Sequence, residues 1–156
     1  MDDSLKQRRA VAADAAAIRA LTRAAYAKWI AVIGREPTPM AADYDSAVRE
    51  HRFDLLEADG ALAALIETID EADHLLIENL AVAPALQGRG LARRLLAHAE
   101  ALAADLGYRE IRLYSNKQFH ENVALYLKFG YRIDSEEPFR GGWTVNMSKP
   151  ISPGLG

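Results

Sequence analysis

The chain has 156 residues, of which 50% are hydrophobic and 26% charged, and it contains no cysteine. This composition is typical of one globular domain, and the lack of cysteine excludes a disulfide framework, a thiolate zinc site and a cysteine nucleophile. A net charge of −3 argues against a dedicated nucleic-acid-binding protein, and no apolar run is long enough to cross a bilayer. The charged first residues also lack the apolar segment of a secretory signal. We therefore expect one soluble, cytoplasmic domain over residues 1–156, with neither nucleic acid nor membrane as a partner.

Hydrophobic periodicity and turn residues predict an alternation of strands and helices. Asp14 stands where a helix cap belongs, prolines and a glycine break residues 33–40, and Asp59-Gly60 is a hairpin turn signal. Gly107 and Gly130 are placed to end two helices. The elements expected in chain order are a strand over 5–10, helices over 15–29 and 42–50, strands from 53, over 61–69 and over 74–82, a helix over 90–106, a strand over 110–114, a helix over 119–129, and strands over 131–135 and 144–148. This order predicts an α+β fold with a mixed sheet.

A glycine-rich turn joins the strand that ends at Val82 to the long helix. It reads Gln87-Gly88-Arg89-Gly90-Leu91-Ala92, and Arg93 and Arg94 follow it. Glycines at a helix start let the backbone approach a ligand, and the free N–H groups of the first turn attract anions. The arginines are unfavourable at the positive end of a helix dipole unless an anion binds there. The turn therefore predicts a phosphate site; the plainer alternative is a glycine turn with solvated arginines.

Three segments together resemble the GNAT superfamily of coenzyme A-dependent N-acetyltransferases. Leu80-Ala81-Val82-Ala83-Pro84 and the glycine turn are similar to that family's fourth strand and acyl-CoA signature. Glu121-Asn122-Val123-Ala124-Leu125-Tyr126, followed by Lys128-Phe129-Gly130-Tyr131, is similar to its last helix. The resemblance covers nearly the whole chain and implies the GNAT fold: a central, mostly antiparallel, twisted sheet flanked by helices.

The resemblance also implies where acetyl-CoA binds. The strand backbone would pair with the pantetheine arm, and the glycine turn would wrap the pyrophosphate. Many members have an asparagine seven residues before the tyrosine; here Phe119 holds that position, and Asn122 is the candidate for the pantetheine contact. With the arginine cluster, the expected cofactor-binding residues are Leu80, Ala81, Val82, Gln87, Gly88, Arg89, Gly90, Leu91, Ala92, Arg93 and Asn122.

Acetyl transfer to an amine requires a base for the amine and a proton for the leaving thiolate. Glu78 is the candidate base because it stands in phase with Leu80 and Val82 among apolar neighbours, where burial would raise its pKa. Glu67, or water alone, is the alternative. Tyr126 is the candidate acid through its family position; otherwise it is a core tyrosine. A backbone N–H of the strand, with Val82 as the first choice, would hold the oxyanion.

We therefore expect an N-acetyltransferase that transfers an acetyl group from acetyl-CoA to a primary amine by direct attack in a ternary complex. The acceptor stays open between a small amine, an amino acid and a protein amine, and a homodimer is compatible with the sequence. The four histidines lack metal-ligand spacing, so no metal is expected. The alternatives are a catalytically silent acyl-CoA-binding sensor or scaffold, and a phosphate-binding structural domain.

Overall fold

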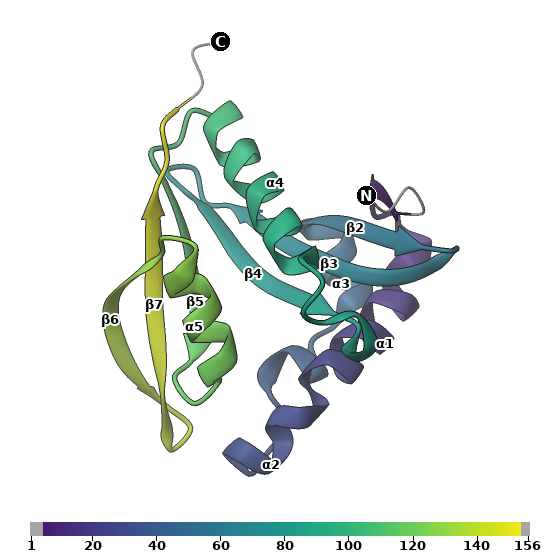
Figure 1. Cartoon of the computed structure of the whole chain (residues 1–156), viewed down its shortest axis with the longest axis horizontal. Coiled ribbons are helices and arrows are strands. Elements are labelled where there is room, and N and C mark those ends of the chain that lie inside the picture. The colour runs from purple at the N-terminus through teal and green to yellow at the C-terminus, as the bar shows by residue number, and fades with distance from the viewer. Residues whose placement is uncertain (1–4, 154–156) are drawn as a thin grey trace.

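A computed structural model describes residues 5–153, which form one seven-stranded sheet with helices packed on it (Figure 1). The expected domain, residues 1–156, reaches beyond this part of the chain, and residues 1–4 and 154–156 lie outside the description. The strands are β1 (Leu5–Arg9), β2 (Arg52–Ala58), β3 (Ala61–Asp70), β4 (Leu75–Val82), β5 (Glu110–Asn116), β6 (Arg132–Phe139) and β7 (Gly142–Pro150). The helices are α1 (Ala15–Tyr26), α2 (Ile30–Ile33), α3 (Tyr44–Glu50), α4 (Leu91–Asp105) and α5 (His120–Lys128).

The sheet is mixed, as the sequence predicts. Its strand order is β1-β2-β3-β4-β5-β7-β6, and every neighbouring pair is antiparallel except β4 and β5. The first strand, β1, forms one edge of the sheet. Asp59 and Gly60 both have positive φ, at 53° and 80°, which the expected two-residue hairpin turn between β2 and β3 requires.

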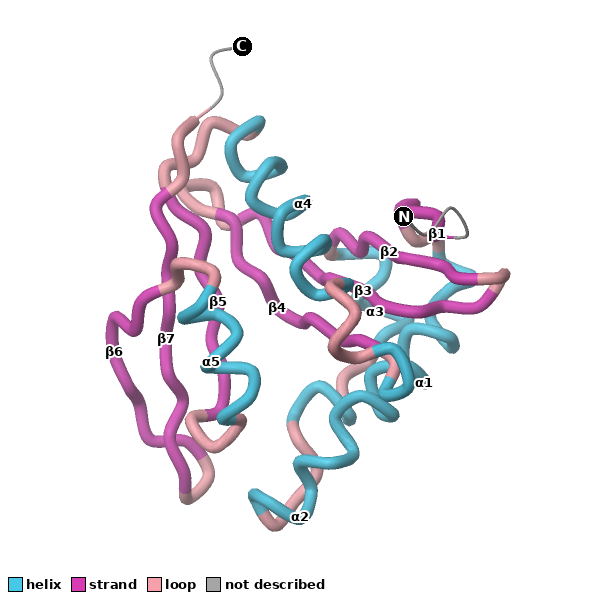
Figure 2. The backbone as a smooth tube through the Cα atoms, viewed as in Figure 1, coloured by secondary structure: helices cyan, strands magenta, loops and turns pink. Residues whose placement is uncertain are grey.

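Strands β4 and β5 pair only at their first residues. Leu75–Ile77 lie opposite Ile111–Leu113, and the two strands then separate, as the backbone tube shows (Figure 2). The separation begins beside a β-bulge: Asn79 pairs with Glu67 and Ile77 with Thr68, so Glu78 is the extra residue on β4. Bulges bend a strand and redirect its side chains, which accounts for a change of direction at this point.

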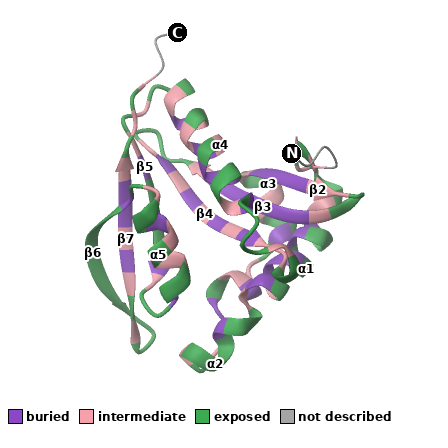
Figure 3. Cartoon of the chain, in the orientation of Figure 1, coloured by how far each residue is buried: buried purple, intermediate pink, exposed green. Residues whose placement is uncertain are grey.

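Two apolar cores lie on opposite faces of the sheet. The larger core packs α4 and α5 against the strands, with Leu95 and Ala99 of α4 fully buried. The smaller packs α1 and α3 against β2, β3 and β4 around Ile18 and Leu65. Burial runs along the central strands, whereas β6 is exposed over its whole length (Figure 3). Within the described residues, β6, at one edge of the sheet, is thus left exposed to solvent.

Several element boundaries differ from the expected ones, each for a local reason. The helix expected over 15–29 ends at Tyr26, and a 3₁₀ turn over Ala27–Trp29 follows, in which the Trp29 ring stacks on Phe119 with ring centres 4.8 Å apart. The Asp14 side chain does not cap α1; it forms an ion pair with Arg8 at 2.8 Å. The last two strands are longer than expected, because the exposed residues of β6 carry no hydrophobic alternation that would reveal a strand.

We predict that Leu95→Ala lowers the free energy of unfolding by about 2–5 kcal/mol, because it leaves a cavity where α4 meets the sheet. Urea unfolding measures the change in the free energy of unfolding. Leu127→Ala is the matched control, since that side chain on α5 is 48% exposed; its effect should stay within about 0.5 kcal/mol. Equal losses in the two variants would contradict the assignment of the core.

Candidate active site

Two cavities meet where β4 and β5 separate. The first, here called the groove, runs along β4 to the start of α4 and encloses about 1180 Å³, including space open to solvent. The second, here called the acceptor pocket, lies between β4, β5, the segment after α2 and the β6–β7 hairpin, and encloses about 670 Å³ on the same basis. Four residues line both cavities: Tyr26, Leu80, Asn122 and Tyr126. A ligand that extends from one cavity into the other must pass these four side chains.

The groove gathers nearly all the residues expected to bind the cofactor. The following expected residues line it: Leu80, Ala81, Val82, Gln87, Gly88, Gly90, Leu91, Ala92, Arg93 and Asn122. Arg89 is the exception, because its exposed side chain is not part of the groove wall. Asn122 lines the groove from α5, whereas Phe119 stacks on Trp29 instead. Asn122 thus contacts the groove, whereas Phe119 packs against Trp29.

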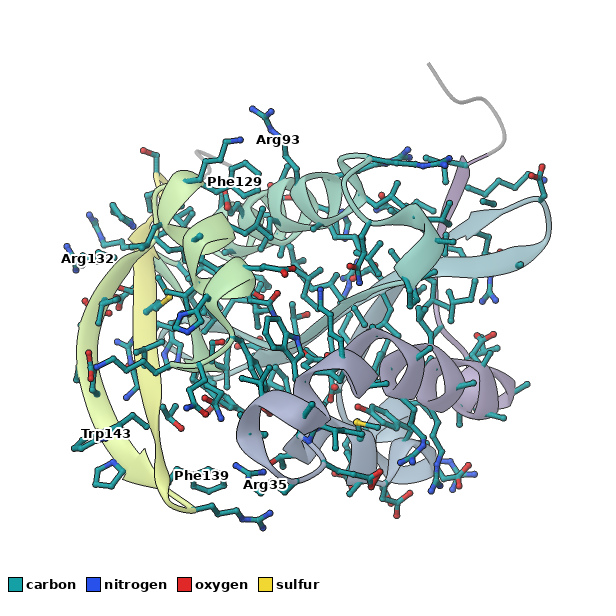
Figure 4. The ribbon with its side chains drawn as sticks, turned by 60° about the horizontal axis from the view of Figure 1, so that its bottom comes forward. Arg35, Arg93, Phe129, Arg132, Phe139 and Trp143 are labelled. Carbon is teal, nitrogen blue, oxygen red and sulfur yellow. The ribbon has the colours of Figure 1, made fainter. Side chains whose placement is uncertain are left out.

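The turn before α4 has the geometry of an anion site. Gly88 and Gly90 have φ of 81° and 83°, in the left-handed region that favours glycine. Gly90 caps α4 without a side-chain hydrogen bond, so within residues 5–153 no cap side chain satisfies the N–H groups of the first turn. Arg93 lines the groove there, with its guanidinium 5.4 Å from the centre of the Phe129 ring (Figure 4). These groups fit a phosphate by charge and by backbone shape.

A polar bridge crosses the groove from the end of α1. The Lys28 ammonium forms an ion pair with Glu121 of α5 at 2.9 Å and donates a hydrogen bond to the Gln87 side chain at 3.2 Å. Lys28 therefore ties the glycine turn to α5 across the cavity. Sequence reasoning missed this bridge because its members are 59 and 93 residues from Lys28 and share no motif.

Glu78 lines the acceptor pocket, at the bulge in β4. Burial raises its pKa from the ordinary value of 4.5 to about 7, the charge of Glu67 adds to the rise, and His51 opposes it. The Tyr114 hydroxyl donates a hydrogen bond to the Glu78 carboxylate. Sequence reasoning missed Tyr114, although strand alternation places it on the opposite face from Leu113 of the core. Glu78 is thus a carboxylate that can take up a proton near neutral pH.

The expected phase of Glu78 with Leu80 and Val82 is wrong. Ile77 and Leu80 pack in the same core beneath α4, although residues three apart face opposite sides of a regular strand. The bulge at Glu78 causes this shift and takes its side chain out of the row that Leu80 and Val82 form. The alternation of side chains along a strand cannot predict the direction of Glu78, because the bulge depends on how β4 pairs with β3.

Glu67, the alternative base, lies outside both cavities. It is 4% exposed, and its carboxylate contacts His51 Nδ1 at 2.6 Å. Burial raises the pKa of Glu67, while the hydrogen bond and charge of His51 lower it. The geometry therefore favours Glu78 over Glu67 for contact with a ligand.

Tyr126 of α5 stands at the junction of the two cavities and is 8% exposed. Burial raises its pKa well above the ordinary tyrosine value, so the hydroxyl keeps its proton at neutral pH. Its ring meets that of Tyr131 edge to face, with ring centres 5.9 Å apart. The packing holds the phenol in place while its side chain lines both cavities.

A buried hydrogen-bond network fixes β4 just beyond the bulge. Asn79 accepts a hydrogen bond from the Tyr26 hydroxyl at 3.0 Å and donates to Thr22 and Tyr44 at 3.2 and 3.3 Å. The Tyr44 hydroxyl in turn donates to the Pro39 carbonyl at 2.7 Å. The network joins α1, α3 and the segment after α2 to the strand, so it positions one wall of the acceptor pocket.

Within residues 5–153, no three histidine, aspartate or glutamate side chains converge in a way that could hold a metal ion. In the same part of the chain, no helix has the length and apolar character needed to span a membrane.

Comparisons with known proteins agree on one family. The family model described as "Acetyltransferase (GNAT) family" matches residues 16–131. N-alpha-acetyltransferase 80 of Mus musculus is 35% identical over 79 residues, which are 51% of this chain and 23% of that protein. This chain therefore matches only about a quarter of that relative's length.

Two solved structures illustrate the shared fold. The ribosomal-protein-S18-alanine N-acetyltransferase of Escherichia coli has a TM-score of 0.78 at 22% identity, with 96% of each chain covered. The PaiA N-acetyltransferase of Thermoplasma acidophilum, solved in complex with coenzyme A, has a TM-score of 0.75 at 20% identity, covering 95% of this chain and 99% of its own. The fold expected from the motifs is thereby confirmed.

We predict that the raised pKa of Glu78 makes stability depend on pH. As pH rises from about 4.5 through 7, the folded chain holds a proton that the unfolded chain has lost, so the free energy of unfolding falls. Glu78→Gln removes this dependence, so wild type should lose stability relative to this variant over that window. Urea unfolding across the range measures the difference, with the exposed Glu50→Gln as the control for losing a carboxylate. Parallel curves for wild type and Glu78→Gln would refute the assignment.

Proposed function

The chain belongs to the acetyltransferase (GNAT) family, and on that premise we propose that it transfers an acetyl group from acetyl-CoA to a primary amine. The observation that carries the proposal is the junction of the two cavities at Tyr26, Leu80, Asn122 and Tyr126. A groove that fits a long phosphorylated molecule opens there into a pocket that contains a carboxylate. Such an arrangement suits direct attack in a ternary complex, with acetyl-CoA in the groove and the amine in the acceptor pocket.

The groove residues have the chemistry that acetyl-CoA requires. The uncapped first turn of α4, the two left-handed glycines and Arg93 suit the pyrophosphate. Beyond Ile77, no strand of residues 5–153 pairs with β4 on its β5 side, so its backbone at Leu80–Val82 can pair with the amides of a pantetheine arm, although the Val82 carbonyl also accepts a hydrogen bond from the Gln87 side chain at 3.2 Å. Asn122 lines the groove opposite this strand and is our candidate for a further pantetheine contact.

In the proposed reaction, the amine nitrogen attacks the thioester carbonyl carbon. A C–N bond forms and the C–S bond breaks, so the nitrogen must lose one proton and the sulfur must gain one. Glu78, directly or through a water, takes the proton from the amine, and its pKa of about 7 suits this exchange at neutral pH. The Tyr126 hydroxyl gives a proton to the sulfur, which conserves charge and atoms. A backbone N–H of β4, with Val82 as the first candidate, stabilises the negative charge that develops on the carbonyl oxygen.

A catalytically silent acyl-CoA-binding module is the main rival. It needs the groove but has no use for a carboxylate and a phenol that meet in a second cavity. CoA release from acetyl-CoA over a panel of primary amines separates the two, provided that acetyl-CoA raises Tm and free phosphate does not. Binding without amine-dependent release would support the rival, whereas a Tm shift with free phosphate and no larger shift with acetyl-CoA would support a phosphate-binding structural domain.

We predict that Tyr126→Phe lowers kcat by about 10²-fold or more, because it removes the proton donor for the thiolate. The Kd for acetyl-CoA should change little, since the ring and its packing stay. Tyr131→Phe is the matched control. It removes a hydroxyl that donates a hydrogen bond to Glu100 at 3.0 Å, and Tyr131 lines neither cavity. Saturating steady-state kinetics measure both variants, and unchanged turnover in Tyr126→Phe would refute the acid role.

A further inference from the structure

The acceptor pocket combines apolar walls with two opposite charges. Among the described residues that line it, only Glu78 and Arg35 carry a formal charge. Most of the rest of the wall is aromatic or aliphatic and includes Ile33, Pro37 and Phe139. Glu78 already has a task in the proposed reaction, whereas the proposed reaction does not use Arg35. The positive charge of Arg35 in this partly apolar cavity is therefore a candidate contact for a negatively charged group of the ligand.

Arg35 holds a defined position at the opening of the pocket. It follows Gly34, whose φ of 75° ends α2, and its guanidinium lies 5.6 Å from the centre of the Phe139 ring on β6 (Figure 4). Arg35 Nη1 donates to the Glu36 carbonyl oxygen at 3.2 Å. Stacking occupies a face of a guanidinium and leaves its in-plane N–H groups free to donate. Arg35 thus keeps guanidinium N–H groups beyond the one bonded to Glu36 that can donate to a ligand.

Acidic side chains near Arg35 in the sequence are engaged elsewhere. Glu36 forms its ion pair with Arg23 at 2.9 Å. Asp43 caps α3 by accepting hydrogen bonds from the N–H groups of Asp45 and Ser46 at 3.1 and 3.2 Å. No ion pair joins Arg35 to a carboxylate within residues 5–153. The positive charge in the pocket is therefore available to a ligand.

We propose that the acceptor is a primary amine that also carries a carboxylate, bound by Arg35 while its amine lies toward Glu78 and the junction of the cavities. The inference rests on the proposed function and names the substrate class of that site. A guanidinium binds a planar carboxylate through two parallel hydrogen bonds, which are stronger than neutral ones. The carboxylate can belong to a free amino acid or to the first residues of a peptide, and the experiment separates these sources.

The chain offers a matched control for Arg35. Arg140, at the tip of the β6–β7 hairpin, also stacks on Phe139, with its guanidinium 5.2 Å from the ring centre. Arg140 does not line the acceptor pocket. Arg140→Gln therefore removes the same charge and the same kind of stacking contact as Arg35→Gln, without removing a pocket donor.

The test compares acceptors in pairs that differ by one charge, with rates expressed per neutral amine because amidation also lowers the pKa of a neighbouring amine. Each pair holds a carboxylate and its amide: phenylalanine with phenylalaninamide, 4-aminobutyrate with its amide, and peptides that begin with Asp or with Asn. We expect wild type to favour the carboxylate member of at least one pair by about tenfold or more in kcat/KM, from one charge-assisted contact. Arg35→Gln should abolish that preference, Arg35→Glu should reverse it, and Arg140→Gln should keep it. Preference in the small pairs identifies a free amino acid, and preference in the peptide pair identifies a peptide.

The outcomes distinguish this inference from the proposed function. If amines are acetylated without preference for the carboxylate, the substrate class is wrong. If Arg140→Gln loses as much preference as Arg35→Gln, the assignment of the contact to Arg35 is wrong. Acetyl transfer stands in both cases. If acetyl-CoA raises Tm but no amine promotes CoA release, the proposed function fails and the inference falls with it. A Tm shift by acetyl-CoA that is equal in all variants shows that each is folded.

Discussion

The loss of pairing between β4 and β5 after Ile77 is the constraint on which the site depends. A sheet normally satisfies its backbone groups on both sides of an inner strand, and an inner strand left unpaired is costly unless something else takes the place of its neighbour. Here β3 continues to pair with β4 up to Val82, while β7 continues to pair with β5 up to Asn116. The sheet therefore stays continuous, but after Ile77 a gap, here called the wedge, widens between β4 and β5. The acceptor pocket lies between the two separating strands, and the groove lies beside them, between the end of β4 and α5.

Side chains from distant parts of the chain keep the wedge open and in shape. The Asn79 network fixes β4 to α1 and α3, and Phe119 stacks on Trp29 to join the start of α5 to the end of α1. Lys28 then bridges to Glu121 of α5. These contacts explain why α1 breaks into a 3₁₀ turn where it does: Trp29 and Lys28 must face the wedge. The same elements that support the fold thus determine which atoms a ligand meets.

Motifs and spacing were enough to predict two of the three segments that line the groove, residues 80–93 and 121–129, whereas the third, residues 25–29, has no such motif. The residue types in these segments directly indicate the local backbone conformation, as at Gly88, Gly90 and the end of β4. The acceptor pocket could not be predicted in the same way. Glu78 is a good example: its residue type was informative, but the bulge that redirects it depends on pairing with β3. Tyr114 reaches the pocket through tertiary packing alone, from a strand far from Glu78 in the chain.

The central claim is that the unpaired part of β4 and the turn before α4 form one binding surface for coenzyme A. Titration of ¹⁵N-labelled protein with CoA, followed by assigned amide spectra, tests it most directly because it reports on backbone N–H groups one by one. The account predicts that the largest shifts fall on Leu80–Val82 and on Gly88–Arg93, which form the turn before α4 and the first residues of that helix. Shifts that avoid both segments and gather on the exposed strand β6 would contradict it.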